Sequence, residues 1–383
     1  MDNNFKNHIG LVGAGLGNCL LAWLIKARHP HLQVTIFETE NQIPRNRTWS
    51  FHDTDIPKNA YSLVKALASH QWTTHDVAFP NLKRHCQSGY STIKPDKLEN
   101  QLLKTNVEIR FNSQVTKINS HQIALSDGQE FSFHCVIDGR GHYSARARQG
   151  YQKFVGQTLR LKTPHGLCCP VLMDATVPQI DGYRFFYLLP WTETDLLVED
   201  TRYSTTATLD EASIKSEIHS YVSKKGWAVE TILSTESGVL PLPFSPPDLP
   251  KSDLPKIGMA GGFFHPVTGY SLPDSLRLAD KISSLDTITS EIVVQAIADY
   301  RVKQSLRKKF YYVLNRMMFL AAKPTERIKI FEHFYSLPEE LVQRFYAGDT
   351  HFFDGLRLLT GRPPVPLLPA VRSLFSQKQP EAP

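Results

Sequence analysis

The first forty residues contain two short apolar runs separated by a longer one, which predicts a strand, a helix and a second strand. His8–Val12 and Val34–Phe37 have the length of buried strands. Cys19–Ala27 is rich in Leu, Ala, Trp and Ile, and we expect it to form a buried helix. The helix should end at His29-Pro30, because the residue before a proline disfavours the helical conformation.

The pattern then predicts mostly strands up to about residue 250 and mostly helices after it. Ser126-Asp127-Gly128-Gln129 lies between two short apolar segments and indicates a hairpin. Residues 45–100 show no clear period. The other expected strands are 107–111, 115–118, 136–138, 155–161, 183–189, 195–203 and 237–242, and the expected helices are 209–225, 274–282 and most of 288–359.

A glycine motif stands between the first predicted strand and its helix. Gly13 permits a tight turn, and Gly15 lets backbone N–H groups approach a pyrophosphate at the positive end of the helix. Glu38, at the end of the second strand, can accept hydrogen bonds from ribose hydroxyls. The third motif position holds Asn18 rather than Gly, which weakens the motif. We interpret the unit as a dinucleotide site; the alternative is an ordinary glycine turn.

The glycine motif alone does not separate NAD from FAD, but later segments favour FAD. Flavoproteins of the aromatic-hydroxylase type insert a β-meander into the nucleotide domain, then carry a strand ending in Asp-Gly and a glycine-rich segment beside the flavin. The predicted hairpin, Asp138-Gly139 and Gly258–Gly269 occupy these places. On this likeness the expected FAD-binding residues are Gly13, Gly15, Leu16, Glu38, Val115, Asp138, Gly139, Gly262, Thr268 and Gly269.

These elements predict an α/β fold with a Rossmann-like FAD-binding domain of the aromatic-hydroxylase/geranylgeranyl-reductase type. We expect a discontinuous FAD-binding domain at 1–150 and 251–285 and a β-rich substrate domain at 151–250. Six prolines between Pro241 and Pro255 mark the end of the latter. A helical region that could face a membrane should follow at 286–366, with a tail at 367–383.

Composition narrows the class further. Of 383 residues, 41% are hydrophobic, which is enough for a sizeable core and argues against disorder. Five cysteines without a C-x-x-C pair make a disulfide framework or a thiolate zinc site unexpected, and no metal is predicted. No signal-peptide pattern occurs, and the apolar runs are shorter than the roughly 20 residues that span a bilayer. We therefore expect a location on the cytoplasmic side.

The net charge of +6 is concentrated in one segment. Between Arg301 and Lys329 there are nine Lys or Arg and one acid. Apolar residues recur there at helical spacing, while Arg301, Arg307 and Lys308 fall outside their stripe. Such a helix can lie on an anionic membrane surface, or it can pack on a core with a solvated basic face. No nucleic-acid module is visible. The stripe consists of Val302, Leu306, Phe310, Val313, Met317 and Leu320.

Several motifs together are more specific than the glycine turn. They are Arg47–His52 (RTWSFH), Val136–Gly141 (VIDGRG), Pro164–Leu167 (PHGL), Leu172–Val177 (LMDATV), Leu196–Tyr203 (LLVEDTRY), His265–Pro273 (HPVTGYSLP) and Arg344–Gly348 (RFYAG). In these the chain resembles the bacterial lycopene β-cyclases, carotenogenic flavoproteins that depend on FAD. The resemblance extends from about residue 8 to 366. Met259 stands where related hydroxylases carry an Asp near the ribityl chain.

The resemblance implies a redox-neutral cyclisation. The ψ-ends of lycopene or a related carotene would become β-ionone rings, by way of γ-carotene to β-carotene. The enzyme would need reduced FAD, with NADPH or another donor as the reductant, and would work as a peripheral membrane protein. The alternatives are a FAD monooxygenase or polyene reductase acting on an isoprenoid lipid, and a binding protein without turnover. The oligomeric state stays open.

Cyclisation needs an acid that is protonated near neutral pH, and burial in an apolar pocket provides this by disfavouring the anion. Glu199 and Asp200 are adjacent on a predicted strand and so point to opposite faces. Arg202 shares the face of Asp200 and would keep it ionised. By elimination Glu199 is the better acid, and the resemblance selects the same residue; by the residues alone, both could be ion-paired sheet residues.

Other residues have weaker claims to a role. His265 has a possible proton-handling role beside a structural one, and Asp200 is the less favoured acid. A group of aromatic residues could line a polyene tunnel and add cation–π stabilisation, or could be plain core. This group consists of Tyr183, Phe185, Phe186, Tyr187 and Trp191.

Overall fold

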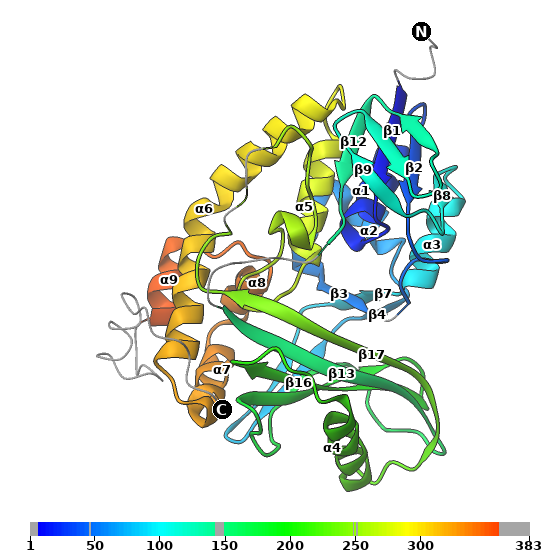
Figure 1. Ribbon diagram of the computed structural model, residues 1–383. Coiled ribbons are helices and arrows are strands. Elements are labelled where there is room, and N and C mark those ends of the chain that lie inside the picture. Colours follow the sequence, from blue (N-terminus) through cyan, green and yellow to red (C-terminus); the bar gives the residue numbers. More distant parts are fainter. Residues whose placement is uncertain (1–6, 46, 142–148, 248, 250–251, 360–383) are drawn as a thin grey trace.

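A computed structural model (Figure 1) describes residues 7–45, 47–141, 149–247, 249 and 252–359. The first strand of the chain belongs to a parallel four-stranded sheet in the order β12-β1-β2-β8. Its strands are β12 (Cys135–Asp138), β1 (His8–Val12), β2 (Gln33–Phe37) and β8 (Glu108–Arg110). The predicted helix is α1 (Leu16–Arg28), which packs against α5 (Leu272–Ser283).

Apolar side chains explain why α1 sits between the sheet and α5. Leu20, Leu21, Leu24 and Ile25 are fully buried in a core cluster that also contains Leu276 of α5. Gly17 faces Gly258, where an added Cβ would lie 3.6 Å from the backbone nitrogen. The absence of a side chain on both sides lets the helix approach the glycine-rich segment closely, so this core positions the loops of the nucleotide-type unit.

Two smaller sheets flank the parallel sheet. The predicted meander is present as the antiparallel sheet β11-β10-β9, and a second three-stranded sheet has the order β3-β7-β4. The bounds are β9 (Val115–Ile118), β10 (Gln122–Leu125), β11 (Glu130–Ser132), β3 (Trp49–His52), β4 (His70–Trp72) and β7 (Tyr90–Ile93). Two helices accompany them, α2 (Tyr61–Lys65) and α3 (Pro95–Leu103).

A seven-stranded sheet forms the other half of the molecule, in the order β17-β13-β16-β15-β14-β5-β6. Helix α4 (Glu211–Lys224) covers one face of it (Figure 1). The opposite face is turned toward the small sheet β3-β7-β4 and toward the part of the molecule that contains the parallel sheet, which we call the FAD-type half. The strands are β17 (Val229–Pro243), β13 (Gln149–Leu161), β16 (Asp195–Ser204), β15 (Tyr183–Pro190), β14 (Val171–Asp174), β5 (His75–Phe79) and β6 (Leu82–Cys86).

Helices complete the described chain. The 31-residue α6 (Ser290–Leu320) extends along the outer edge from the parallel sheet to the large sheet (Figure 1). It is followed by α7 (Arg327–Ser336), α8 (Glu339–Tyr346) and α9 (Phe352–Leu359). Within the described ranges, no helix combines the length and the apolar character needed to cross a membrane.

The predicted fold class is confirmed: a parallel α/β unit is joined to a β-rich half and C-terminal helices. The predicted domain bounds stay a prediction, and strand pairing departs from them at one place. β5 and β6 fall within the predicted 1–150 unit but belong to the large sheet, because β5 pairs in parallel with β14. The predicted tail at 367–383 lies outside the described residues.

Candidate active site

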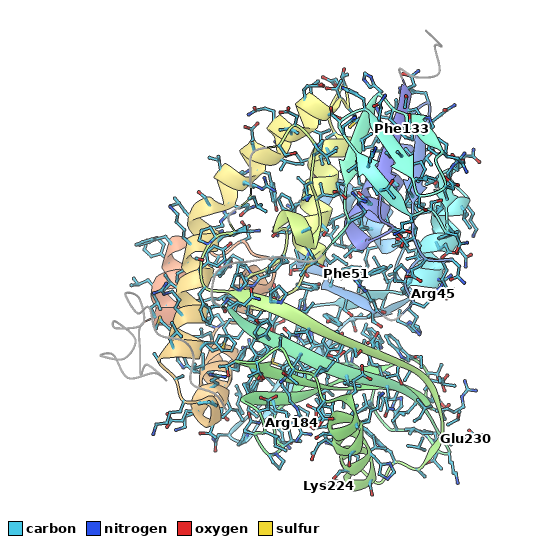
Figure 2. The ribbon with its side chains drawn as sticks, viewed as in Figure 1. Arg45, Phe51, Phe133, Arg184, Lys224 and Glu230 are labelled. Atoms are coloured by element: carbon cyan, nitrogen blue, oxygen red, sulfur yellow. The ribbon has the colours of Figure 1, made fainter. Side chains whose placement is uncertain are left out.

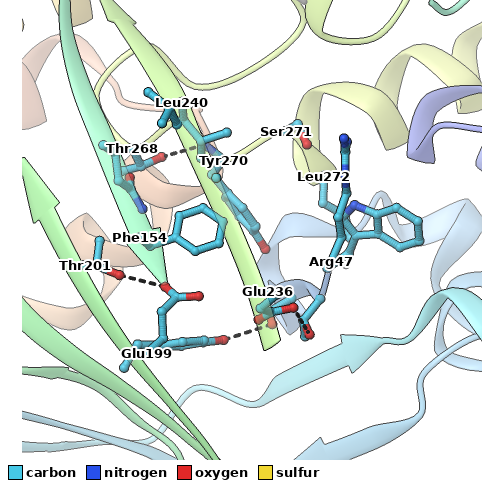
Figure 3. Close-up of a pocket in the computed structure, with 18 of the residues that line it drawn as sticks. Arg47, Phe154, Glu199, Thr201, Glu236, Leu240, Thr268, Tyr270, Ser271 and Leu272 are labelled. Carbon is cyan, nitrogen blue, oxygen red and sulfur yellow. Dashed lines mark hydrogen bonds between the residues drawn. The ribbon is translucent and has the colours of Figure 1, made fainter. Parts of the chain in front are cut away.

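A cavity of about 540 Å³ lies between the large sheet and the FAD-type half of the molecule (Figure 3). Most of its lining comes from three parts of the chain: residues 47–52, strands β13, β15, β16 and β17, and residues 268–272. The volume is in the range of ligand pockets, and the lining is mostly apolar and aromatic. Of the predicted site residues, it brings together Glu199, Thr268 and Gly269.

Glu199 faces this cavity from the middle of β16 and is buried. Its carboxyl group accepts a hydrogen bond from the Thr201 hydroxyl, at 2.6 Å to Oε1. Burial raises the pKa of Glu199 to about 8, with a smaller contribution from the charge of Glu236. The carboxyl group can therefore be protonated at neutral pH, as a proton donor must be.

Asp200 points to the opposite face of β16, as strand alternation predicts. It is completely buried and accepts hydrogen bonds from two guanidinium groups, Arg184 at 2.8 Å and Arg202 at 3.0 Å. Arg184 also contacts Glu217 of α4 at 2.9 Å, and Figure 2 shows it on the α4 side of the sheet. Asp200 therefore joins the sheet to α4 and does not line the cavity.

A second carboxylate, which the sequence analysis missed, lines the same cavity. Glu236 of β17 is half-buried and accepts a hydrogen bond from the Thr48 hydroxyl at 3.0 Å. Burial raises the pKa of Glu236, while the Thr48 hydrogen bond and the charge of Lys94 oppose that rise. No motif surrounds Glu236, so only strand register could have revealed it.

Gly156 lets these two acidic side chains approach each other. On β13 it pairs with Glu199 of β16 on one side and with Glu236 of β17 on the other. A Cβ added at Gly156 would lie 3.2 Å from Cγ of Glu236 and 3.3 Å from Cβ of Glu199. Both side chains therefore border the space that any side chain at position 156 would fill. Figure 3 shows Glu199 and Glu236 at the cavity.

The predicted aromatic group divides between cavity and core. Phe185 and Tyr187 line the cavity, and the Tyr187 hydroxyl lies 2.9 Å from those of Ser50 and Tyr90. The other three members pack elsewhere: Tyr183 stacks on Phe331, Phe186 stacks on Tyr221, and Trp191 lies under the Lys94 ammonium group. The tunnel interpretation therefore applies to two of the five residues.

His265 lies outside the cavity lining, among Tyr311 and Phe345. Its Nδ1 accepts a hydrogen bond from the Val267 backbone at 3.2 Å. Burial lowers the pKa of His265 to about 3, so the ring is neutral. These contacts favour its structural role, in holding the turn that carries Thr268 and Gly269.

The glycine motif has the geometry that a pyrophosphate needs. Gly15 precedes the first turn of α1, where no side chain caps the helix and no acidic residue occurs. A Cβ at Gly15 would meet nothing within 4 Å, so there is free space beside the turn that precedes α1. Glu38 closes the other side, with Oε2 accepting from the Ala14 backbone at 2.6 Å. These residues fit a dinucleotide.

Asn18 explains the departure at the third motif position. Its side-chain amide donates to the carbonyl oxygens of Val12 at 2.9 Å and Gly13 at 2.8 Å, which fixes the turn. Gly139 packs against the same amide, because a Cβ there would lie only 2.5 Å from the Asn18 nitrogen. The position that usually holds glycine is therefore filled by a side chain that braces the loop.

The remaining predicted cofactor residues surround this turn or continue toward the cavity. Asp138 accepts from Arg140 at 3.0 Å, and Arg140 in turn donates to the carbonyl of Val115 at 3.0 Å. The Gly262 carbonyl accepts from Lys308 at 2.9 Å. Gly269 has a φ of +66°, which favours glycine, and packs on Leu240.

The outer surface of α6 and α9 carries exposed apolar side chains. Val302 and Leu306 of α6 are 74% and 77% exposed. On α9 the exposed apolar residues are Phe352, Phe353, Leu356 and Leu359. The rest of the predicted α6 stripe is half-buried, and Lys308 is engaged with Asp274 at 2.8 Å, so only the first part of the predicted stripe is free to meet a partner.

One group of potential metal ligands lies away from the cavity, on the large sheet. It consists of Asp76, His85 and Cys169. A hydrogen bond of 2.6 Å between His85 and Asp76 accounts for the approach of these two side chains. We assign no function to the group.

Comparisons with known proteins give a family and a fold. The family model described as "Lycopene cyclase protein" matches residues 9–372. The chain is 38% identical over 371 residues to a lycopene beta-cyclase of Pantoea ananas, covering 96% of this chain and 97% of the relative.

Two solved structures share the architecture. A geranylgeranyl bacteriochlorophyll reductase-like protein of Thermoplasma acidophilum superposes with a TM-score of 0.59 at 11% identity, covering 96% of this chain and 98% of that one. A flavoprotein/dehydrogenase of Cytophaga hutchinsonii gives 0.56 at 12% identity, with 89% and 92% covered. These two likenesses concern the fold.

Proposed function

Because the chain belongs to the lycopene cyclase family, we propose that it closes the ψ-ends of lycopene into β-ionone rings, by way of γ-carotene to β-carotene. The observation that carries the proposal is the position of Glu199. It is a buried carboxyl group with a raised pKa, and it faces a largely apolar cavity of about 540 Å³. Such a group can protonate an alkene that enters the cavity.

The cavity also suits the cation that protonation creates. Phe185 and Tyr187 present aromatic rings there, which attract positive charge. The largely apolar lining limits access of water, which would otherwise capture the cation. This chain's own residues would therefore supply the acid, the aromatic surface and a largely apolar cavity for the reaction.

The proposed cofactor is FAD in its reduced form, with NADPH or another donor as the reductant. The support is the open glycine turn at the start of α1, together with the flavoprotein-like fold. Reduced FAD, when bound, supplies an electron-rich ring that stabilises positive charge. Gly13, Gly15 and Glu38 would hold its nucleotide end, and Thr268 and Gly269 would lie nearer its reactive end.

The test is to express the chain in cells that accumulate lycopene and to identify the pigments by chromatography and mass. The proposal predicts cyclic products with the mass of lycopene, formed with catalytic amounts of reductant. Oxygenated or reduced products, with NADPH consumed in proportion, would instead establish the monooxygenase or reductase alternative. Unchanged lycopene in the presence of folded, FAD-loaded protein would refute the cyclase proposal.

The substrate dissolves in bilayers, and we propose that the protein binds peripherally to the cytoplasmic face of a membrane. The support is the set of exposed apolar side chains on α6 and α9. Figure 1 shows these two helices side by side at one edge of the molecule. Lys303, Lys309 and Arg357 are exposed on the same two helices and could contact anionic headgroups.

Liposome co-sedimentation tests this attachment. The chain should sediment with anionic vesicles at low salt, and Leu306→Glu combined with Phe352→Glu should reduce binding at least tenfold. Leu103→Glu is the matched control, because Leu103 is half-exposed on the remote helix α3. A wild-type chain that stays in the supernatant would contradict the proposal, and so would equal losses in the control.

A further inference from the structure

We propose that Glu236 is the base of the cyclisation, which takes the ring proton after Glu199 has protonated the substrate. This inference rests on the proposed function and adds a second proton-transfer residue to it. Both carboxyl groups line one cavity, so a single end group can contact both. The residues come from separate strands, β16 and β17, on either side of β13.

The spacing of the strands places the two carboxyl groups on either side of β13. With one strand between them, their Cα atoms are roughly 10 Å apart, because neighbouring strands are about 4.8 Å apart. The two side chains border the space above Gly156, which has no side chain to separate them. An end group in front of this pair therefore meets one carboxyl group from each side of β13.

The surroundings of the two carboxyl groups differ in a way that assigns the roles. The Glu199 carboxyl group accepts a hydrogen bond from the neutral Thr201 hydroxyl, and its burial in the cavity wall disfavours the anion. Glu236 accepts a hydrogen bond from the Thr48 hydroxyl, and the positive charge of the Lys94 ammonium group acts on it as well. Both interactions favour the anionic form of Glu236. This difference favours the proton on Glu199 and the charge on Glu236 when the pair holds a single proton.

The reaction balances with these two residues. Glu199 donates its proton to the terminal double bond, whose π electrons form the new C–H bond and leave a tertiary cation. The next double bond of the end group attacks this cation, which closes the ring and moves the charge to the methyl-bearing ring carbon. Glu236 removes the proton from the neighbouring ring carbon that carries the polyene chain. The electrons of that C–H bond become the ring double bond of the β-ring. Transfer of one proton from Glu236 to Glu199 restores the starting state.

The test is cyclisation in D₂O by the full chain with reduced FAD, comparing wild type, Glu236→Gln and Glu199→Gln. Loss of a general base typically slows a reaction 10²- to 10⁴-fold, so Glu236→Gln should lower β-ring formation at least a hundredfold. Protonation by Glu199 should continue and reverse in this variant. Recovered lycopene should then gain deuterium, or rings should close with the double bond elsewhere. Glu199→Gln should give neither rings nor deuterated lycopene.

Two further variants keep the result interpretable. Glu236→Asp keeps a carboxylate and should restore part of the β-ring formation without deuterium in recovered lycopene, even if the Gln variant folds poorly. Glu230→Gln, an exposed glutamate on the same strand, should behave as wild type (Figure 2).

Each outcome separates the inference from the proposed function. A wild-type chain that forms no rings overturns both. Wild-type rings with a Glu236→Gln variant that is within threefold of wild type overturn the role of Glu236 alone. Its role is also overturned if this variant loses rings without deuterium in lycopene, because that result would reduce Glu236 to positioning or tuning Glu199.

Discussion

The raised pKa of Glu199 makes a quantitative prediction about pH. A carboxyl group with a pKa of about 8 is roughly 90% protonated at pH 7, whereas one with the ordinary value of 4.5 is about 0.3% protonated. Burial therefore increases the amount of available acid about 300-fold at pH 7. Because the proton donor must be protonated, cyclisation should be nearly constant just below pH 7 and should fall about tenfold per pH unit above pH 8.

The assay is the single-turnover rate of ring formation with FAD reduced beforehand in the absence of oxygen, so that the reductant does not affect the profile. Thr201→Val identifies the responsible group. The Thr201 hydroxyl donates to Glu199 and lowers its pKa, so its removal should move the alkaline limb to higher pH. Glu199→Gln should reduce the rate at least a hundredfold below pH 8 and should abolish the alkaline limb.

Unfolding measurements give an independent check that needs no substrate. Between pH 4.5 and 8 the unfolded chain has Glu199 ionised while the folded chain keeps the proton, so the stability of the fold should decrease as pH rises. Relative to Glu199→Gln, wild type should lose about 1.4 kcal/mol per pH unit in this window. The reasoning would be refuted if the cyclisation rate fell with rising pH from about 4.5 instead of 8. It would also be refuted if wild type and Glu199→Gln showed the same pH dependence of stability.

Three further changes separate cofactor binding, sheet stability and local packing. Gly15→Val fills the open space before α1, so bound FAD measured by absorbance should be lost with unchanged circular dichroism; retained FAD would contradict the assignment. Asp200→Asn leaves Arg184 buried without its anionic partner and should lower the free energy of unfolding in urea by about 3–5 kcal/mol. A change under 1 kcal/mol would show that the pair contributes little. Tyr270→Phe removes a 2.9 Å hydrogen bond to the buried Asp55 and should cost about 1–3 kcal/mol by the same measurement; unchanged stability would mean that water replaces the hydroxyl.

Local periodicity was sufficient for much of the fold. The strand–helix–strand unit and the hairpin depend on neighbours in sequence, and both occur with bounds close to those expected. The alternation along β16 also placed Glu199 and Asp200 on opposite faces, because a regular strand has a period of two. These features could be predicted since each is determined within about ten residues.

Pairing between distant segments was not predictable in the same way. Glu236 meets Glu199 only through the register of β13 with both β16 and β17, and the β13–β17 ladder contains irregularities that shift its register. The parallel pairing of β5 with β14 likewise joins two segments that no local pattern connects. On α6, the stripe identified by spacing is not the face that packs inward, because Tyr300, Tyr311 and Asn315 are among its buried positions and none of the stripe residues is.

Gly156 affects both the stability of β13 and the arrangement of the two acidic side chains. A glycine inside a strand typically costs 0.5–1 kcal/mol relative to alanine, so the centre of the 13-residue β13 is weaker than its sequence could make it. Substitutions that replace strand glycines are a usual way to raise the melting temperature. Here the added methyl group would stand between the two acidic side chains. Because this methyl group would also crowd Leu197, a side chain at position 156 should disturb the arrangement of the two glutamates, and such variants should cyclise less even where the strand itself tolerates the change.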